Sequence, residues 1–235
     1  MERILITGAL GQLGQEFIKF FNKNNTYVLA TDIRSPLKVL SCDFEIADAM
    51  DEKKIDYLIK KNNINVVYHL VAVLSANGEK NPFMAWEINM KSFQNIINLS
   101  INNGIKKIFW PSSIAVFGTK SNLSLVKQDC ILNPNTIYGI SKLAGERLID
   151  YYNNKFDLDI RSLRYPGIIS FDTKPGGGTT DYIIEMIQSL KNEKEYTCFL
   201  NKNTKLPMLY IDDAINGTIK YMSKNNQSFE LFIKS

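Results

Sequence analysis

The chain has 235 residues, of which 45% are hydrophobic and 22% charged, which is enough for roughly one or two domains with a large apolar core. Its formal net charge of +4 is modest and its lysines are scattered among asparagines, which argues against nucleic acid as a main partner. No stretch approaches the roughly 20 apolar residues of a membrane helix, and the first strand-like run begins at residue 3, too early for a signal peptide. We therefore expect a cytoplasmic protein without membrane contact, or a mitochondrial one if an upstream leader has been lost.

A glycine-rich turn follows the first apolar run. Residues 3–7 predict a buried strand, and an amphipathic helical pattern runs from Leu13 to Phe21. The turn between them has the spacing Gly-x-x-Gly-x-x-Gly. Glycines there let the backbone approach a pyrophosphate, whose charge is held by backbone N–H groups and the positive end of the helix. We expect the turn to bind a dinucleotide through Gly8, Gly11, Gln12, Leu13 and Gly14.

Two aspartates are candidates for the adenosine half of that dinucleotide. Asp32 ends the next apolar run, 27–31, where a carboxylate can accept both ribose hydroxyls and repels a 2′-phosphate. NAD is therefore favoured over NADP, although Arg34 lies close enough to weaken the repulsion, and Asp32 could instead cap a turn. Asp43 follows an apolar run around Val39, and we interpret it either as a partner of the adenine amine or as a residue without a ligand.

Apolar runs and helical patterns alternate along the chain. Strands are predicted near Ile4, Val28, Val39, Val66, Ile108 and Ile160, and helices near Phe17, Leu58, Ile96 and Leu148. This order predicts an α/β fold with a doubly wound parallel sheet of the Rossmann type, in which ligands bind at the carboxyl ends of the strands. The glycine turn, Asp32, His69 and Ser113 all fall at such predicted ends.

Metal-dependent chemistry is not indicated. The three cysteines, Cys42, Cys130 and Cys198, are far apart and His69 is the only histidine, so the sequence has no zinc-site spacing. We expect His69 to be a buried residue at a strand end beside the cofactor, rather than a ligand or a base.

Tyr138 and Lys142 form a pair that fits proton transfer. Two other Tyr-x-x-x-Lys pairs begin at residues 57 and 151, but only Tyr138 follows a Ser-Ser turn that comes directly after an apolar run. Lowering a phenol pKa from about 10 to about 7 takes roughly 4 kcal/mol, which one positive charge about 4 Å away can supply. We predict that Tyr138 accepts a proton from a substrate hydroxyl and that Lys142 lowers the pKa of Tyr138 and holds the nicotinamide ribose. Ser113 is expected to hydrogen-bond the substrate oxygen.

The composition changes after Tyr165. The glycine-rich stretch 175–180 fits a mobile loop over the site, or alternatively a surface linker. We predict an NAD-binding domain over residues 1–165 and a small, incomplete substrate-binding lobe over residues 166–235. Tyr165, at their boundary, is counted among the cofactor-binding residues.

Several stretches together resemble one family. They are 7–14; 69–82, reading HLVAVLSANGEKNP; 111–114; 136–139; and 161–182, reading RSLRYPGIISFDTKPGGGTTDY, continued by 196–200 and 206–208. Through these residues the chain is similar to extended short-chain dehydrogenases. More narrowly, it resembles the non-zinc L-threonine 3-dehydrogenases over nearly its whole length, to about Ser223. The block 161–182 is the most specific part, because nucleotide-sugar enzymes of the superfamily do not share it.

The resemblance implies NAD-dependent oxidation of the C3 hydroxyl of L-threonine to 2-amino-3-ketobutyrate, in a homodimer built on the long helices near Phe93 and Leu148. By position it also implies that Ser75 and Thr179 contact the amino acid, whose ammonium and carboxylate need hydroxyl partners. Members of the family continue beyond the point at which this sequence ends, adding helices that close the substrate lobe. For this reason a truncated NAD-binding protein with little turnover stays open as an alternative. A nucleotide-sugar epimerase or dehydratase of the same superfamily is a second alternative, although it would need a large C-terminal lobe that this sequence lacks.

Overall fold

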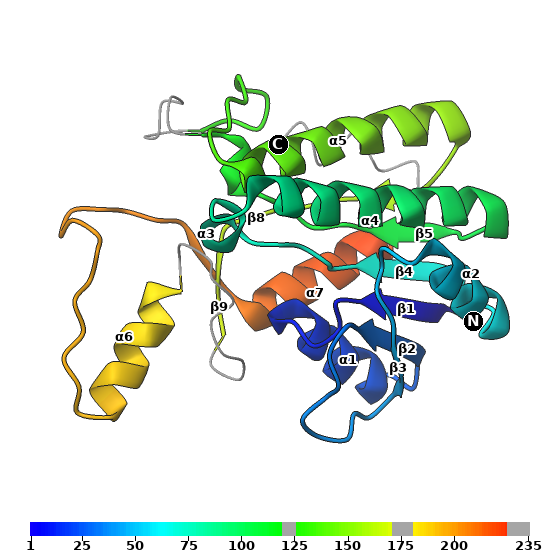
Figure 1. Cartoon of the computed structure of the whole chain (residues 1–235), viewed down its shortest axis with the longest axis horizontal. Coiled ribbons are helices and arrows are strands. Elements are labelled where there is room, and N and C mark those ends of the chain that lie inside the picture. The colour runs from blue at the N-terminus through cyan, green and yellow to red at the C-terminus, as the bar shows by residue number, and fades with distance from the viewer. Residues whose placement is uncertain (119–125, 171–180, 225–235) are drawn as a thin grey trace.

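The computed structural model describes residues 1–118, 126–170 and 181–224, so Thr179 and the glycine-rich stretch 175–180 lie outside the described residues. Figure 1 shows a central sheet between two layers of helices. The six strands of this sheet are parallel and stand in the order β3-β2-β1-β4-β5-β7, as in a doubly wound nucleotide-binding sheet. The predicted fold class is confirmed.

Five of the six predicted strands form where they were expected. The strands of the main sheet are β1 (Arg3–Thr7), β2 (Tyr27–Asp32), β3 (Asp43–Ile46), β4 (Val66–His69), β5 (Lys107–Phe109) and β7 (Ile160–Arg161). The strand predicted near Val39 is wrong, because Val39 is fully exposed and outside any strand. The third strand begins at Asp43 instead. This strand was not recognised because two of its four residues, Asp43 and Glu45, are acidic and interrupt the apolar pattern. Within the strand, Phe44 alone packs against the buried core.

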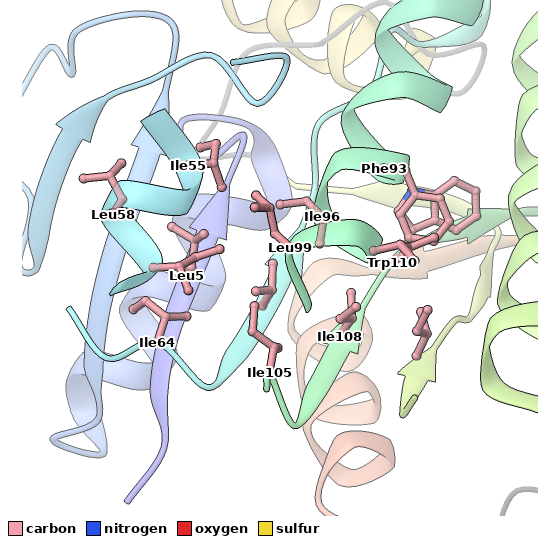
Figure 2. Close-up of a cluster of buried hydrophobic side chains, with 14 of the residues drawn as sticks. Leu5, Ile55, Leu58, Ile64, Phe93, Ile96, Leu99, Ile105, Ile108 and Trp110 are labelled. Carbon is pink, nitrogen blue, oxygen red and sulfur yellow. The ribbon is translucent and has the colours of Figure 1, made fainter. Parts of the chain in front are cut away.

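The two faces of the sheet carry two separate cores, because successive side chains of a strand point in opposite directions. On one face, Leu5 belongs to the same cluster as Ile55 of α2 and Phe93 of α4 (Figure 2). On the other face, Ile4 belongs to the same cluster as Phe17 of α1. The helices predicted around Phe17, Leu58, Ile96 and Leu148 are confirmed as α1 (Gln12–Lys23), α2 (Glu52–Lys61), α4 (Pro82–Asn103) and α5 (Ile137–Phe156). Among the described residues, no helix combines the length and apolarity needed to cross a membrane.

Several further elements were not predicted, most of them short. They are α3 (Ser75–Gly78), β6 (Ser112–Ser113), the 3-10 turn η1 (Ile114–Val116), β8 (Arg164–Tyr165), β9 (Gly167–Ile169), α6 (Tyr182–Lys191), β10 (Met208–Tyr210) and α7 (Ile211–Met222). Strands β6 and β8 pair in parallel, as do β9 and β10. Because β6 follows β5 almost at once, it carries the chain past the carboxyl edge of the main sheet.

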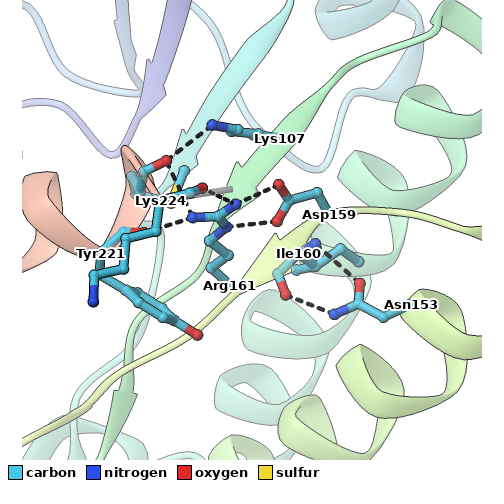
Figure 3. Close-up of polar contacts among 8 residues, drawn as sticks. Lys107, Asn153, Asp159, Ile160, Arg161, Tyr221 and Lys224 are labelled. Atoms are coloured by element: carbon cyan, nitrogen blue, oxygen red, sulfur yellow. Dashed lines mark hydrogen bonds and ion pairs between the residues drawn. The ribbon is translucent and has the colours of Figure 1, made fainter. Parts of the chain in front are cut away.

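Helix α7 covers the same face of the sheet as α1, and a buried arginine holds its end (Figure 3). Arg161 forms a two-point ion pair with Asp159, at 2.6 and 2.7 Å, and donates hydrogen bonds to three carbonyl oxygens at the end of α7. A cation at the carboxyl end of a helix stabilises it. The predicted substrate-binding part of the chain therefore returns to the nucleotide-binding sheet through α7. The division of the chain near residue 165 stays a prediction.

Candidate active site

Four of the predicted site positions meet at one edge of the sheet. Gly8 follows β1, Asp32 ends β2, His69 ends β4, and Ser113 lies in β6, just beyond β5. The strand register places the last residue of β1, Thr7, level with His69 on one side and with the end of β2 on the other. This is the carboxyl edge, where doubly wound sheets bind their ligands.

The glycine turn folds tightly between β1 and α1. Gly8 has a φ of +70°, and a Cβ at Gly14 would lie 2.5 Å from a carbonyl oxygen of the turn itself, so neither position accepts a larger residue without strain. Gly11 is the N-cap of α1 and offers no side chain to the first helical N–H groups, at Gln12 and Leu13. Backbone donors at the positive end of a helix, lined by glycines, form a cradle that fits a pyrophosphate.

Asp32 is buried and both of its carboxylate oxygens accept hydrogen bonds. Oδ2 accepts from the N–H of Leu10 at 3.1 Å, and Oδ1 accepts from the N–H and the Nε of Arg34 at 3.1 and 3.0 Å. The hydrogen bond and charge of Asp32 raise the pKa of Arg34 above its ordinary value. The carboxylate expected to bind the ribose is thus paired with an arginine whose side chain is 64% exposed and can move aside.

Asp43 does not lie at this edge. It opens β3 instead of following a strand, and its register partner on β2 is Leu29, three positions before Asp32. At about 3.3 Å per residue, Asp43 stands about 10 Å along the strands from the level of Asp32. Its side chain lies beside Tyr27, whose pKa is raised by burial and by the hydrogen bond to Asp43. The placement of Asp43 at a strand end was therefore wrong, and Ile46 takes that position.

Helix α5 brings Tyr138 and Lys142 to this edge, one helical turn apart. The ammonium of Lys142 is buried, donates a hydrogen bond of 2.7 Å to the carbonyl oxygen of Pro111, and lies 5.5 Å from the centroid of the Tyr138 ring. Ser113 hydrogen-bonds to the phenol of Tyr138, and its hydroxyl accepts from the N–H of Ala115 at 3.2 Å. The three residues predicted to be catalytic are thus brought together.

The electrostatics of these groups differ from the sequence-based expectation. Burial raises the pKa of Tyr138 to about 12, an effect that the hydrogen bond from Ser113 partly opposes. Burial also lowers the pKa of Lys142 to about 7. The surrounding protein therefore does not lower the pKa of Tyr138 as predicted, because desolvation of the phenolate outweighs the stabilising groups.

Two side chains fix the start of α5. The hydroxyl of Thr136 accepts from the N–H of Gly139 at 3.1 Å, and Oε1 of Glu79 accepts from the N–H of Ile137 at 2.8 Å. Glu79 directly follows α3, so this contact holds α3 beside the start of α5. Ser75, the first residue of α3 and a predicted substrate contact, is partly exposed there.

Glu146 was not singled out from the sequence, yet it fixes the strand that carries Ser113. Its carboxylate accepts from the hydroxyl of Ser112 at 2.6 Å and pairs with Arg164 at 2.8 and 2.7 Å. Ser112 and Arg164 are register partners in β6 and β8. The carboxylate therefore joins α5 to the short sheet beside it. Its spacing of one helical turn from Lys142 is the sequence signal that could have drawn attention to Glu146.

Asn89 was also missed. Its side-chain amide accepts from the N–H of Val73 at 2.7 Å and donates to the carbonyl oxygen of Val73 and the hydroxyl of Ser141, both at 3.2 Å. Ser141 lies between Tyr138 and Lys142. The amide therefore connects α4, α5 and the segment that leads into α3. A contact between residues so far apart in the sequence cannot be predicted from a local pattern.

The side chain of Tyr165 points away from the site. Its hydroxyl hydrogen-bonds to that of Thr218 on α7, and its ring lies 6.2 Å from that of Phe109 within the core. Only the backbone of Tyr165, which pairs with Ser113, lies beside the predicted catalytic residues. The side chain of Tyr165 therefore packs in the core, and only its backbone lies near the carboxyl edge of the sheet.

His69 is fully buried at the end of β4, as expected. Its Nδ1 lies 2.7 Å from the hydroxyl of Thr7 and its Nε2 lies 3.1 Å from that of Ser92. Burial and the nearby charge of Lys142 lower the pKa of His69 to about 3, so the ring is neutral at physiological pH. In the described part of the chain, no group of three or more histidine, cysteine or acidic residues could hold a metal ion.

Comparisons with known proteins show similarity over nearly the whole chain. The model of the NAD dependent epimerase/dehydratase family matches residues 4–232. An uncharacterised epimerase/dehydratase of Staphylococcus aureus is 40% identical over 237 residues, which cover 98% of this chain and 73% of that protein.

Two solved structures are similar over nearly the whole chain. A partial consensus L-threonine 3-dehydrogenase has a TM-score of 0.94 at 40% identity, covering 96% of this chain and 74% of that one. The holo form of a GalE-like L-threonine dehydrogenase from Cupriavidus necator has a TM-score of 0.91 at 38% identity, again covering 96% and 74%.

Proposed function

The chain belongs to the NAD dependent epimerase/dehydratase family, and from this premise we propose that it oxidises L-threonine at C3 to 2-amino-3-ketobutyrate with NAD. The family and the threonine dehydrogenases of similar structure support NAD as the cofactor and an oxidoreductase activity. The choice of threonine is supported by those two structures, because both are of L-threonine dehydrogenases. The single observation that carries the chemistry is the meeting of Ser113, Tyr138 and Lys142 at the edge of the sheet that also holds the glycine turn.

The dinucleotide would lie along this edge. The N–H groups at the start of α1 would hold its pyrophosphate, Asp32 its adenosine ribose, and Lys142 its nicotinamide ribose. To bind a ribose, Asp32 has to exchange its contacts with the Arg34 side chain for the ribose hydroxyls. Bound NAD would supply the hydride acceptor and a second positive charge near Tyr138.

Tyr138 would take the proton of the substrate hydroxyl. With a pKa of about 12 the phenol is protonated at neutral pH, and bringing that pKa to about 7 takes about 7 kcal/mol. One positive charge at 4 Å and an effective dielectric near 20 contributes about 4 kcal/mol, so Lys142 alone is insufficient. The hydroxyl of Ser113 would donate a hydrogen bond to the substrate oxygen as the proton leaves.

The amino acid would bind between α3 and α5. Ser75 lies at the start of α3, which Glu79 holds beside Ile137. Thr179, the second predicted contact, lies outside the described residues. Hydroxyl groups suit both ends of a zwitterion, because they donate to a carboxylate and accept from an ammonium.

We also propose that the protein is a cytoplasmic homodimer. On α4 and α5, large apolar side chains are exposed to solvent: Phe83, Trp86, Ile101, Ile140, Tyr151 and Phe156. Apolar side chains exposed together on two neighbouring helices fit a buried interface. Light scattering after size-exclusion chromatography should give twice the chain mass of 26.8 kDa. A mass of one chain at micromolar concentration would remove the dimer from the proposal.

The experiment that tests the function is a substrate comparison. Purified protein is mixed with NAD and either L-threonine, L-serine or a nucleotide sugar, and NADH formation and product identity are followed. The proposal predicts NADH and aminoketone formation with threonine. Conversion of a nucleotide sugar would favour the epimerase or dehydratase alternative, whereas NAD binding without turnover of any of them would favour an NAD-binding protein.

A further inference from the structure

Trp110 stands between the two long helices at the carboxyl edge of the sheet. It directly follows β5, and its side chain is 1% exposed. Its backbone N–H donates a hydrogen bond of 2.9 Å to the carbonyl oxygen of Arg161. On one side its ring stacks on Phe93 of α4, with centroids 4.7 Å apart, and the two rings overlap in Figure 2. On the other side it meets α5 at Gly145, where a Cβ would lie 2.3 Å from the indole. The ring is therefore held flat between α4 and α5.

The ammonium of Lys142 lies on the face of this ring. Nζ is 4.1 Å from the centroid of the indole and 2.7 Å from the carbonyl oxygen of Pro111. A cation within about 6 Å over an aromatic face is attracted by the ring quadrupole, most strongly when water is excluded, and tryptophan is the best such partner. Lys142 is 2% exposed, so this attraction acts without much competition from solvent.

Because the charged groups nearby are engaged elsewhere, the ring of Trp110 is the main side-chain partner of the Lys142 ammonium. Among the described residues, Lys142 forms no ion pair with a carboxylate. Of the titratable groups on the elements around it, His69 on β4 is neutral, and Glu146 on α5 is paired with Arg164 on β8. Glu79, after α3, accepts from the backbone at the start of α5. A buried cation without a counter-ion needs another source of stabilisation.

The polar edge of the indole does not explain why a tryptophan stands here. Its Nε1 is buried and has no hydrogen-bond partner among the described residues. Aromatic N–H groups are normally paired when buried. The contact that uses the aromatic character of Trp110 is the one between its face and Lys142.

We propose that the face of the Trp110 ring holds the charged side chain of Lys142 beside Tyr138, so that Trp110 is a positioning residue for proton transfer. The inference rests on the proposed function for its role in catalysis, but the contact itself can be tested without turnover. Loss of the ring face removes a stabiliser of the cation only, so the pKa of Lys142 falls. Lys142 is then discharged at a lower pH, and any step that needs its charge is lost at a lower pH.

The test is an NMR titration of protein labelled with ¹³C at the lysine ε-carbon, with the Lys142 signal assigned by its absence in Lys142→Arg. Trp110→Leu fills much of the space but has no aromatic face, whereas Trp110→Phe keeps a smaller aromatic face and loses one ring of the indole together with an N–H that has no partner. We expect the leucine variant to lower the Lys142 midpoint by about one pH unit, a tenfold change in the protonation equilibrium, and the phenylalanine variant to lower it by less than half as much. Tyr57→Leu removes an exposed ring near Lys54 and Lys61 and serves as the control, with an unchanged Lys142 midpoint.

Equal midpoints in wild type and the leucine variant, or equal shifts in the leucine and phenylalanine variants, would overturn the proposal. If the leucine variant does not fold, Gly145→Ala displaces the ring from α5 and should produce the same fall in the midpoint. The catalytic half is tested separately, by the pH dependence of kcat/KM with threonine. The fall of kcat/KM at alkaline pH should begin at a lower pH in the leucine variant than in the wild type. In the phenylalanine variant it should lie close to that of the wild type. A shifted midpoint in a protein that does not oxidise threonine would contradict the proposed function while leaving the contact of Trp110 with Lys142 intact.

Discussion

The backbone N–H of Leu10 donates a hydrogen bond of 3.1 Å to Oδ2 of Asp32. This bond ties the glycine turn after β1 to the end of β2. The donors that fit a pyrophosphate and the carboxylate that fits a ribose are therefore parts of one rigid unit. A change at Asp32 is expected to affect both the choice between NAD and NADP and the affinity for either.

Asp32→Ala is expected to narrow the preference for NAD over NADP, because the carboxylate that repels a 2′-phosphate is removed while Arg34 remains. Calorimetric titration with both dinucleotides gives the ratio of the two dissociation constants. The matched variant Arg34→Ala keeps the carboxylate and should widen the same ratio. Equal affinity of the wild-type protein for the two dinucleotides would show that Asp32 does not select NAD.

Gly14→Ala should weaken NAD binding at least tenfold. The Cβ of the new alanine would lie 2.5 Å from a carbonyl oxygen of the turn, so the turn has to shift. Forced repacking of this kind costs roughly 1–3 kcal/mol. Gly217→Ala, on α7, is the control, because a Cβ there has no neighbour within 4 Å. It should leave NAD binding unchanged and raise stability by up to about 1 kcal/mol. Similar effects of the two variants on NAD affinity would contradict the assignment of the turn.

Glu146→Gln should reduce both stability and turnover. It removes the charge that pairs with Arg164 and weakens the hold on Ser112, next to Ser113. We expect a loss of about 1–3 kcal/mol in the free energy of unfolding, below the cost at a fully buried pair because the two side chains are 11% and 16% exposed. Misplacement of Ser113 should lower kcat by roughly tenfold.

Asp150→Asn provides the comparison for that variant on the same helix. Asp150 pairs with Arg147 at 3.1 Å, but both side chains are more than half exposed, so the pair contributes little. Urea unfolding and steady-state kinetics of the two variants should therefore separate clearly. A kcat for Glu146→Gln as high as that for Asp150→Asn would show that the contact does not position Ser113.

The sequence predicted those parts of the fold and the site that depend on local patterns. Strand β1, the glycine turn and α1 follow from residues that are adjacent in the chain, and Tyr138 and Lys142 follow from one turn of a helix. The third strand was misplaced because the apolar run around Val39 gave a stronger local signal than residues 43–46, whose single core contact is Phe44. As a result, Asp43 was predicted to follow the third strand, whereas it is the first residue of that strand.

The parts that were missed depend on contacts between distant residues. Glu146 and Arg164 are 18 positions apart, and Asn89 and Ser141 are 52 apart. For Tyr165, the position next to the site could be predicted from the sequence, but the direction of its side chain could not, because the packing against α7 decides it. The pKa of Tyr138 could not be predicted either, because it depends on how much of the phenol the fold buries.

The most direct test of the account is the rate of NADH formation with L-threonine in the wild-type protein and in Tyr138→Phe, measured together with NAD affinity. The account predicts threonine-dependent NADH formation in the wild type. It predicts a loss of roughly 10²–10⁴-fold or more in the variant, because the proton acceptor is gone. NAD affinity should be nearly unchanged, since the glycine turn is untouched. Turnover of the variant close to that of the wild type would contradict the assignment of Tyr138 as the base.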